Sequence, residues 1–219
     1  MLDTVKAPVV QGLVEQIEIN AQRRGWNSPP GFYVIYDAND RESDEAYRTL
    51  LPPQAATGEW PLSRPPYIAR MVFRSALLLP NPVHALYWLA LILSEPRIPG
   101  HAAAKEMIAM LGQPGLVALA LRHEGWGQAA STRQEMLARI PGRPFMDRPD
   151  SKEYRFVHCV DVTGAHCTAS RVRGQTPRVG TPLEVMGAVP EALTVILAAA
   201  TGAPLPPLTC EPRGWGEPD

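Results

Sequence analysis

Residues 116–126 read LVALALRHEGW and residues 154–173 read YRFVHCVDVTGAHCTASRVR, and these two stretches decide the fold. Both are rich in β-branched, aromatic and small apolar residues, and glycine or proline lies near their ends. We predict strands at 116–126, 154–162 and 165–173, with Thr163-Gly164 as a two-residue hairpin turn between the last two. Strands in succession predict the antiparallel centre of a sheet.

The rest of the chain is mostly helical in pattern. The segment 83–93 is apolar nearly all round, so we expect a central core helix with Leu86, Leu89 and Leu93 buried. An aromatic and β-branched run at 32–36 favours one more strand. Helical spacing of apolar residues predicts further helices at 8–24, 67–79, 102–111 and 191–201.

This order of elements defines the fold class. We predict an α+β fold with a mostly antiparallel sheet of about four strands and helices packed on one face. One domain should span residues 1–205, with a long loop at 129–152 inside it. Residues 206–219 are rich in proline and glycine, which predicts an extended tail.

The charge of the chain limits its partners. The 219 residues carry a formal net charge of −1, and 45% are hydrophobic, enough for a substantial core. A near-neutral chain disfavours nucleic acid as a partner. Arginine outnumbers lysine 18 to 3, a usage typical of GC-rich, actinobacterial-like genomes. The N-terminus shows no secretory signal, and the segment 83–93 is about half as long as a membrane span, so no membrane partner is expected.

Three cysteines are present, Cys159, Cys167 and Cys210, and no two of them form a CxxC motif. This count and spacing disfavour a disulfide framework or a zinc ribbon. A two-residue turn would place Cys159 opposite Thr168 and Cys167 opposite Val160, on opposite faces of the sheet. We therefore expect free thiols and a cytoplasmic location.

The predicted hairpin also holds the candidates for catalysis. In this register Asp161 faces His166, and Cys159 lies next to them on the same face. A carboxylate, an imidazole and a thiol within two rungs could support a nucleophilic site in a small hydrolase or transferase. No nucleophile elbow accompanies them. The simpler interpretation is a polar pair close to a turn, at the edge of the sheet.

Metal and cofactor sites are not predicted. His123-Glu124 begins a zincin-like motif, but Gly127 stands where the second histidine is required. The two-residue turn would place His158 and His166 on opposite faces, so the three histidines could not converge. The sequence also holds no GxxxxGK[ST] or GxGxxG loop, so we expect no nucleotide cofactor.

The long loop and the tail are the candidate partner-binding segments. The residues that we expect to contact a partner are Arg139, Arg143, Phe145, Arg148 and Trp215. Arginine and aromatic side chains on a loop held by a rigid sheet are typical of protein recognition. We therefore predict a non-catalytic cytoplasmic binding protein with a protein partner: an adaptor, a regulator or a mobile-element accessory protein. The pattern does not define its oligomeric state.

Overall fold

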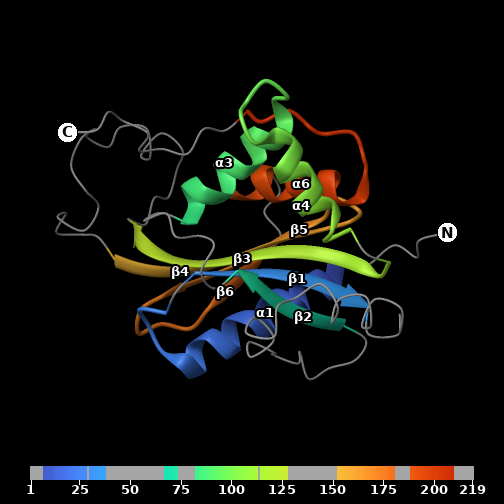
Figure 1. Cartoon of the computed structure of the whole chain (residues 1–219). Helices are drawn as coiled ribbons and strands as arrows, with labels where there is room; N and C mark the ends of the chain where they lie inside the picture. Colours follow the sequence, from blue (N-terminus) through green and yellow to red (C-terminus); the bar gives the residue numbers. More distant parts are fainter. Residues whose placement is uncertain are drawn as a thin grey trace, which may run out of the picture.

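The computed structural model has an α+β fold built on an antiparallel sheet, which confirms the predicted class (Figure 1). It describes residues 7–28, 30–37, 67–73, 82–112, 114–127, 152–180 and 188–209. None of the helices among these residues has the length and hydrophobicity that a membrane span requires.

The sheet has six strands in the order β2-β1-β3-β4-β5-β6. Each neighbouring pair is antiparallel. The prediction of about four strands therefore missed the two edge strands, β2 and β6. The strands are β1 (Gly31–Asp37), β2 (Tyr67–Phe73), β3 (Leu116–Gly127), β4 (Lys152–Asp161), β5 (His166–Val172) and β6 (Arg178–Gly180).

Helices cover both faces of the sheet, not one face as predicted. The helices are α1 (Ala7–Arg24), α3 (Pro82–Ser94), α4 (His101–Ala109) and α6 (Ala188–Thr201). Figure 1 shows α3, α4 and α6 above the sheet and α1 below it. Alternate strand residues explain this: Val34 packs in the cluster beneath α6, whereas Ile35 packs against α1. Two apolar faces require two helical covers.

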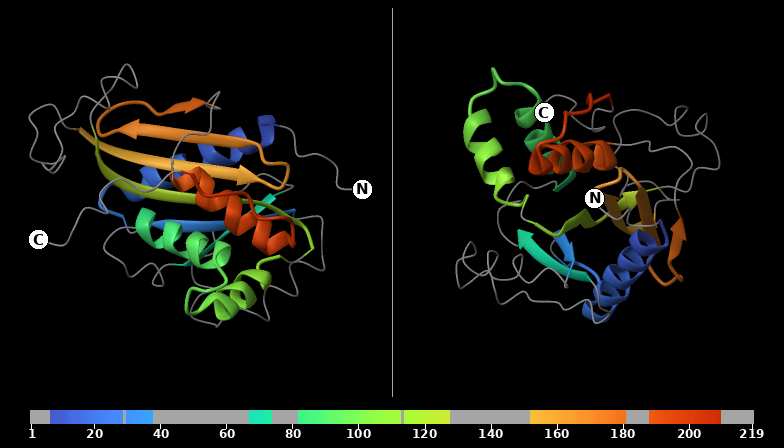
Figure 2. Two further views of the ribbon diagram at one scale, coloured as in Figure 1. Left: turned by 90° about the horizontal axis from the view of Figure 1, so that it is seen from above. Right: turned by 90° about the vertical axis from the view of Figure 1, so that its right-hand side faces the viewer.

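The larger core lies between the sheet and the layer formed by α3, α4 and α6 (Figure 2). Leu193 and Ile196 of α6 are fully buried there. Leu86 and Leu93 of α3 are buried as predicted, but Leu89 is half-buried. Trp88 is 39% exposed, so α3 has a solvent-facing side. The central helix of this layer is α6, which packs against α3, α4 and strands β3 and β4.

Helix α1 was predicted from its apolar stripe, and the structure confirms it. Leu13, Val14 and Ile17 pack on the sheet. Arg23 and Arg24 occupy the last turn, where cations complement the helix dipole. Gly25 follows with φ of 87°, the left-handed conformation that commonly ends a helix.

Residues 67–73 form a strand, so the prediction of a helix over 67–79 is wrong. They pair with β1 along its length, from Phe32 opposite Phe73 to Asp37 opposite Tyr67. Tertiary pairing therefore overrode a helical spacing of apolar residues. The aromatic and β-branched residues of this run were the available signal for a strand.

The chain after α6 is described as far as Thr209. The amide and hydroxyl groups of Thr209 donate hydrogen bonds to the Glu191 carboxylate of α6, at 2.7 Å and 2.6 Å. Leu208 packs against the larger core. The predicted extended tail therefore begins as a segment docked on α6, and residues 210–219, with Trp215, lie outside the described residues.

Candidate functional site

The turn between β4 and β5 has three residues, not two. The Gly164 amide donates to the Asp161 carbonyl at 2.9 Å, and the Asp161 amide donates to the Ala165 carbonyl at 3.0 Å. Gly164 has φ of 84°, the left-handed conformation that closes a three-residue hairpin loop. The two-residue turn predicted at Thr163-Gly164 is therefore wrong, and the register of the hairpin shifts by one residue.

This shift brings the two hairpin cysteines together. Cys159 pairs directly with Cys167, and each is 1% exposed in the cluster between α1 and the sheet. The predicted placement on opposite faces is wrong, because a one-residue slip reverses the direction of every side chain. Both are free thiols in the structure. Burial raises the pKa of the Cys159 thiol, so it stays protonated and is a weak nucleophile.

Asp161 holds the turn and does not face His166. The Asp161 side chain is fully buried. Its Oδ1 accepts hydrogen bonds from the Thr163 amide (2.8 Å), the Thr163 hydroxyl (2.6 Å) and the Ala165 amide (2.9 Å). His166 pairs with Val160 instead. Burial lowers the pKa of His166, although the Asp161 charge acts in the opposite sense.

The three candidate catalytic residues therefore do not form one site. Cys159 packs beneath α1, whereas His166 lies beside Val160 on the opposite face of the sheet. The thiol is protonated, and the Asp161 carboxylate is committed to the turn. A nucleophilic site needs a base within hydrogen-bond reach of its nucleophile, and this hairpin does not provide that contact.

The three histidines share the face that lies beneath α6. His166 pairs with Val160, and His158 lies two residues before Val160 on the same strand, so both histidines point to the same face. The predicted placement on opposite faces is wrong. They are spread along the strands, and within the described residues no group of three potential ligands could hold a metal ion. His123 instead stacks on Phe156 and His158, with ring centroids 5.4 Å and 5.6 Å apart.

Tyr154, Phe156, His158 and His123 form what we call the aromatic row. Tyr154 lies 5.5 Å from Phe156, centroid to centroid. Burial lowers the pKa of His123 to about 4, assisted by the Arg122 charge, and lowers that of His158 to about 3. Both imidazoles are therefore neutral at pH 7 and behave as flat, weakly polar rings. His158 also shares a hydrogen bond with the Thr168 hydroxyl, at 3.3 Å.

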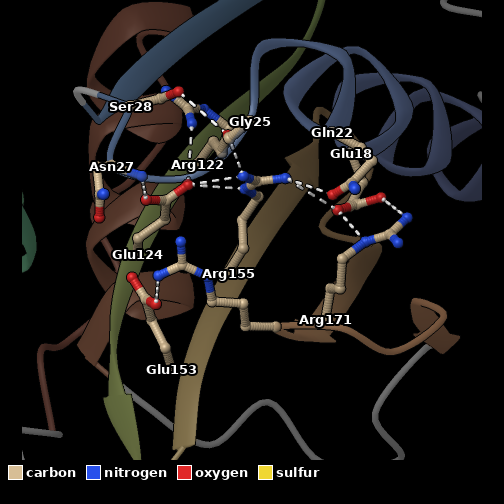
Figure 3. A network of polar contacts seen from close by, with 11 residues as sticks. Glu18, Gln22, Gly25, Asn27, Ser28, Arg122, Glu124, Glu153, Arg155 and Arg171 are labelled. Carbon is tan, nitrogen blue, oxygen red and sulfur yellow. Dashed lines mark hydrogen bonds and ion pairs between the residues drawn. The ribbon is translucent and has the colours of Figure 1, made fainter.

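A buried ion network joins α1 to the face of the sheet on which it packs (Figure 3). The Arg155 side chain is 0% exposed and contacts Glu18 at 3.4 Å and Glu124 at 2.8 Å. It also donates to Gln22 and to the Gly25 carbonyl at the end of α1. One guanidinium thus binds the last two turns of α1, the following loop and β3.

Glu18 is shared with a second arginine. Arg171 binds both of its carboxylate oxygens, each at 2.7 Å, in the forked geometry that makes such pairs strong. Glu124 in turn accepts a hydrogen bond from the Asn27 amide at 2.7 Å. Buried charges are tolerated when they are paired and hydrogen-bonded in this way, so the primary role of the network is to fix α1 on the sheet.

The network was not predicted, although the sequence carries a signal for it. Glu18 falls on the apolar stripe of α1, one turn after Val14 and beside Ile17. Arg155 and Arg171 stand at inward positions of their strands, two residues from the buried Val157 and Ala169, respectively. A charged residue at an apolar position requires a buried partner of opposite charge. Pairing these inward charges would have predicted the contact.

The same end of the sheet exposes basic side chains, and we call it the basic end. It comprises the exposed Arg23 and Arg24 at the end of α1, Lys152 at the start of β4 and Arg173 after β5. The Trp26 ring lies 4.5 Å from the buried Arg155 guanidinium carbon and 5.6 Å from that of Arg173. These are cation–π distances, so Trp26 links the surface to the buried network.

The predicted partner-binding residues Arg139, Arg143, Phe145 and Arg148 lie outside the described residues, as does Trp215. The two ends of the segment that carries the first four are nevertheless defined. Gly127 at the end of β3 pairs with Lys152 at the start of β4. The segment 128–151 therefore leaves and rejoins the sheet at the basic end.

The fold and these surfaces define an α+β protein with an antiparallel sheet between two helical layers. No protein-family model matches the chain, and no curated protein matches it. No solved structure matches it either. Its function has therefore to be inferred from its own residues.

Proposed function

We propose that the protein is a non-catalytic cytoplasmic binding protein, an adaptor, regulator or mobile-element accessory protein, that contacts a protein partner at the basic end. The pairing of Gly127 with Lys152 is the observation that carries this proposal. It anchors both ends of the segment 128–151 beside Arg173, whose amide donates to the Glu153 carbonyl at 3.0 Å. Loops held by a rigid scaffold are where binding residues concentrate.

The scaffold at this end is unusually well fixed. Arg155 and Arg171 bind Glu18, so α1 cannot separate from β4 and β5 without breaking buried ion pairs. A surface that is already ordered loses little conformational entropy on binding, which favours affinity. The network therefore supports a contact surface here as well as stability.

The alternative, a small hydrolase or transferase, is less well supported. Its candidate residues Cys159 and His166 lie on opposite faces of the sheet, and the Asp161 carboxylate accepts hydrogen bonds from the turn. The cytoplasmic location rests on the odd number of cysteines and the absence of a CxxC motif.

Affinity capture from the native host tests the proposal, with proteins identified by mass spectrometry. The tagged full chain should enrich a protein partner, and a variant with residues 130–149 replaced by a short Gly/Ser linker should lose it. The sheet should survive, because loop length changes closure entropy only modestly, and circular dichroism checks this.

The variant Asp161→Asn/His166→Gln serves as the control for an enzyme. If it is folded, it should retain the partner and complement a deletion of the gene. A folded but inactive double variant beside a fully active linker variant would overturn the proposal in favour of an enzyme.

A further inference from the structure

The basic end has a local charge that differs from that of the whole chain. Arg23, Arg24, Lys152 and Arg173 are exposed there, while the chain has a net charge of −1. The Arg173 side chain is 55% exposed. Such a concentration of one sign raises the local potential and attracts partners of opposite charge.

The acidic side chains in this region are already engaged. Glu18 binds Arg155 and Arg171. Glu124 binds Arg155 and the Asn27 amide. Glu153 binds Arg173 at 2.6 Å. Among the described residues of this end, Glu18, Glu124 and Glu153 are thus each paired with an arginine of β3, β4 or β5, or with Arg173 after β5.

The exposed charges are held on different elements. Arg23 and Arg24 lie in the last turn of α1, Lys152 begins β4, and Arg173 follows β5. Arg173 is positioned by its contact with Glu153 (2.6 Å) and by the ring of Trp26. A flexible basic tail would lose conformational entropy on binding, whereas these side chains project from paired strands and a helix end.

We propose that the basic end binds an acidic peptide segment, rich in Asp and Glu, of the protein partner. This inference rests on the proposed function and names the chemistry of the partner. Arginine forks match carboxylates in a bidentate geometry, and the Trp26 ring beside Arg173 adds a flat contact. A long polyanion such as DNA is less well matched, because the surplus is confined to one end of a slightly negative chain.

Fluorescence anisotropy with a labelled decaglutamate peptide tests the inference on the full chain. The wild type should bind the peptide, and binding should weaken as salt rises. The variant Arg23→Glu/Lys152→Glu should weaken binding about tenfold, because charge reversal at a complementary surface costs affinity. Neither residue belongs to the buried network, so the fold should persist.

A matched control separates the site from overall charge. Arg97→Glu/Lys105→Glu changes the net charge equally, and both residues are exposed on the α3–α4 side of the sheet. This variant should bind the peptide within about twofold of the wild type, since distant exposed charges are screened. Equal loss in the two variants, or no binding by the wild type, would overturn the inference.

Two further probes distinguish other anionic partners. A decathymidine oligonucleotide and vesicles containing phosphatidylserine should bind more weakly than the peptide. If either probe binds more tightly than the peptide, the ligand is that class of anion and not an acidic peptide, and the inference is overturned. If the captured partner depends on the segment 130–149 but not on Arg23 and Lys152, the proposed function stands and this inference fails.

Discussion

Asp161 shows how one side chain can determine a register. Its Oδ1 holds three donors of the turn, and the carboxylate is buried. Asp161→Ala would leave the amides of Thr163 and Ala165 without this acceptor, and we expect a loss of about 1–3 kcal/mol in the free energy of unfolding. Urea denaturation measures it. Thr163→Ala, which removes one donor, should cost less; an equal or larger cost would refute the assigned role.

His158 predicts a specific dependence of stability on pH. Burial lowers its pKa in the folded protein to about 3, against an ordinary value of 6.5. Between pH 3 and pH 6.5 the unfolded chain therefore binds a proton at this imidazole, whereas the folded chain does not. The free energy of unfolding consequently falls as the pH decreases below about 6.5. Comparing His158→Phe with the wild type at pH 7 and pH 4.5 isolates this contribution.

The variant should lose less stability over that interval than the wild type does. Parallel pH profiles would contradict the neutral, buried state of this imidazole. His123 and His166 still contribute in both proteins, since burial lowers their pKa values too, so the informative quantity is the difference between the two profiles.

The hairpin residues also show what sequence could not provide. The strands were predictable from composition, but the pairing depended on whether Val162 belongs to β4 or to the turn. That choice is made by the bonds of Asp161 and by the left-handed Gly164. An error of one residue moved Cys167 and His166 to the wrong faces and created the apparent Asp161–His166 pair.

At the scale of elements, α1 is held by charge as well as by apolar packing. Glu18→Gln would leave Arg155 and Arg171 with a neutral partner inside the network. Removing one member of a buried ion pair typically costs about 3–5 kcal/mol, and we expect a loss of this order by chemical denaturation. The exposed pair between Gln11 and Glu15 on the same helix offers a control, since Glu15→Gln should change stability little. Similar effects of the two substitutions would contradict the account.

The contact between α4 and α6 depends on a glycine. A Cβ at Gly112 would lie 1.8 Å from the carbonyl oxygen of Ala200. Gly112→Ala should therefore shift α6 or the end of α4 and lower the melting temperature. Gly12→Ala in α1 meets no atom within 4 Å and should be neutral or stabilising by up to about 1 kcal/mol, as in other exposed helix interiors. A Gly112→Ala protein as stable as the wild type would refute this contact.

Elements with strong local patterns were predicted well, and edge elements were not. Helices α1, α4 and α6 and strands β1, β3, β4 and β5 follow from their apolar spacing. Strand β2 was predicted as a helix because its spacing fits either structure, and only its pairing with β1 decides between them. Helices on the second face of the sheet were not predicted, although the sequence held a signal for them. The run LVALAL makes both faces of β3 apolar, and two apolar faces need two covers.

For the whole molecule, we propose the basic end as the contact surface. Among the described residues, its exposed cations include Arg173, which contacts Trp26, and its carboxylates are engaged internally. None of this was predictable from the net charge of −1, because folding gathers arginines from α1, β4 and β5. The loop arginines predicted to bind a partner belong to the segment 128–151, whose two flanking residues, Gly127 and Lys152, pair at this same end.

Hydrogen–deuterium exchange with and without the decaglutamate peptide tests this claim most directly. Binding should slow amide exchange at residues 22–28 and 172–176, because the ligand covers the end of α1 and the turn after β5. Residues 94–101, between α3 and α4, should exchange at the same rate in both states. Protection confined to residues 94–101, or no protection at the basic end under saturating peptide, would contradict the account.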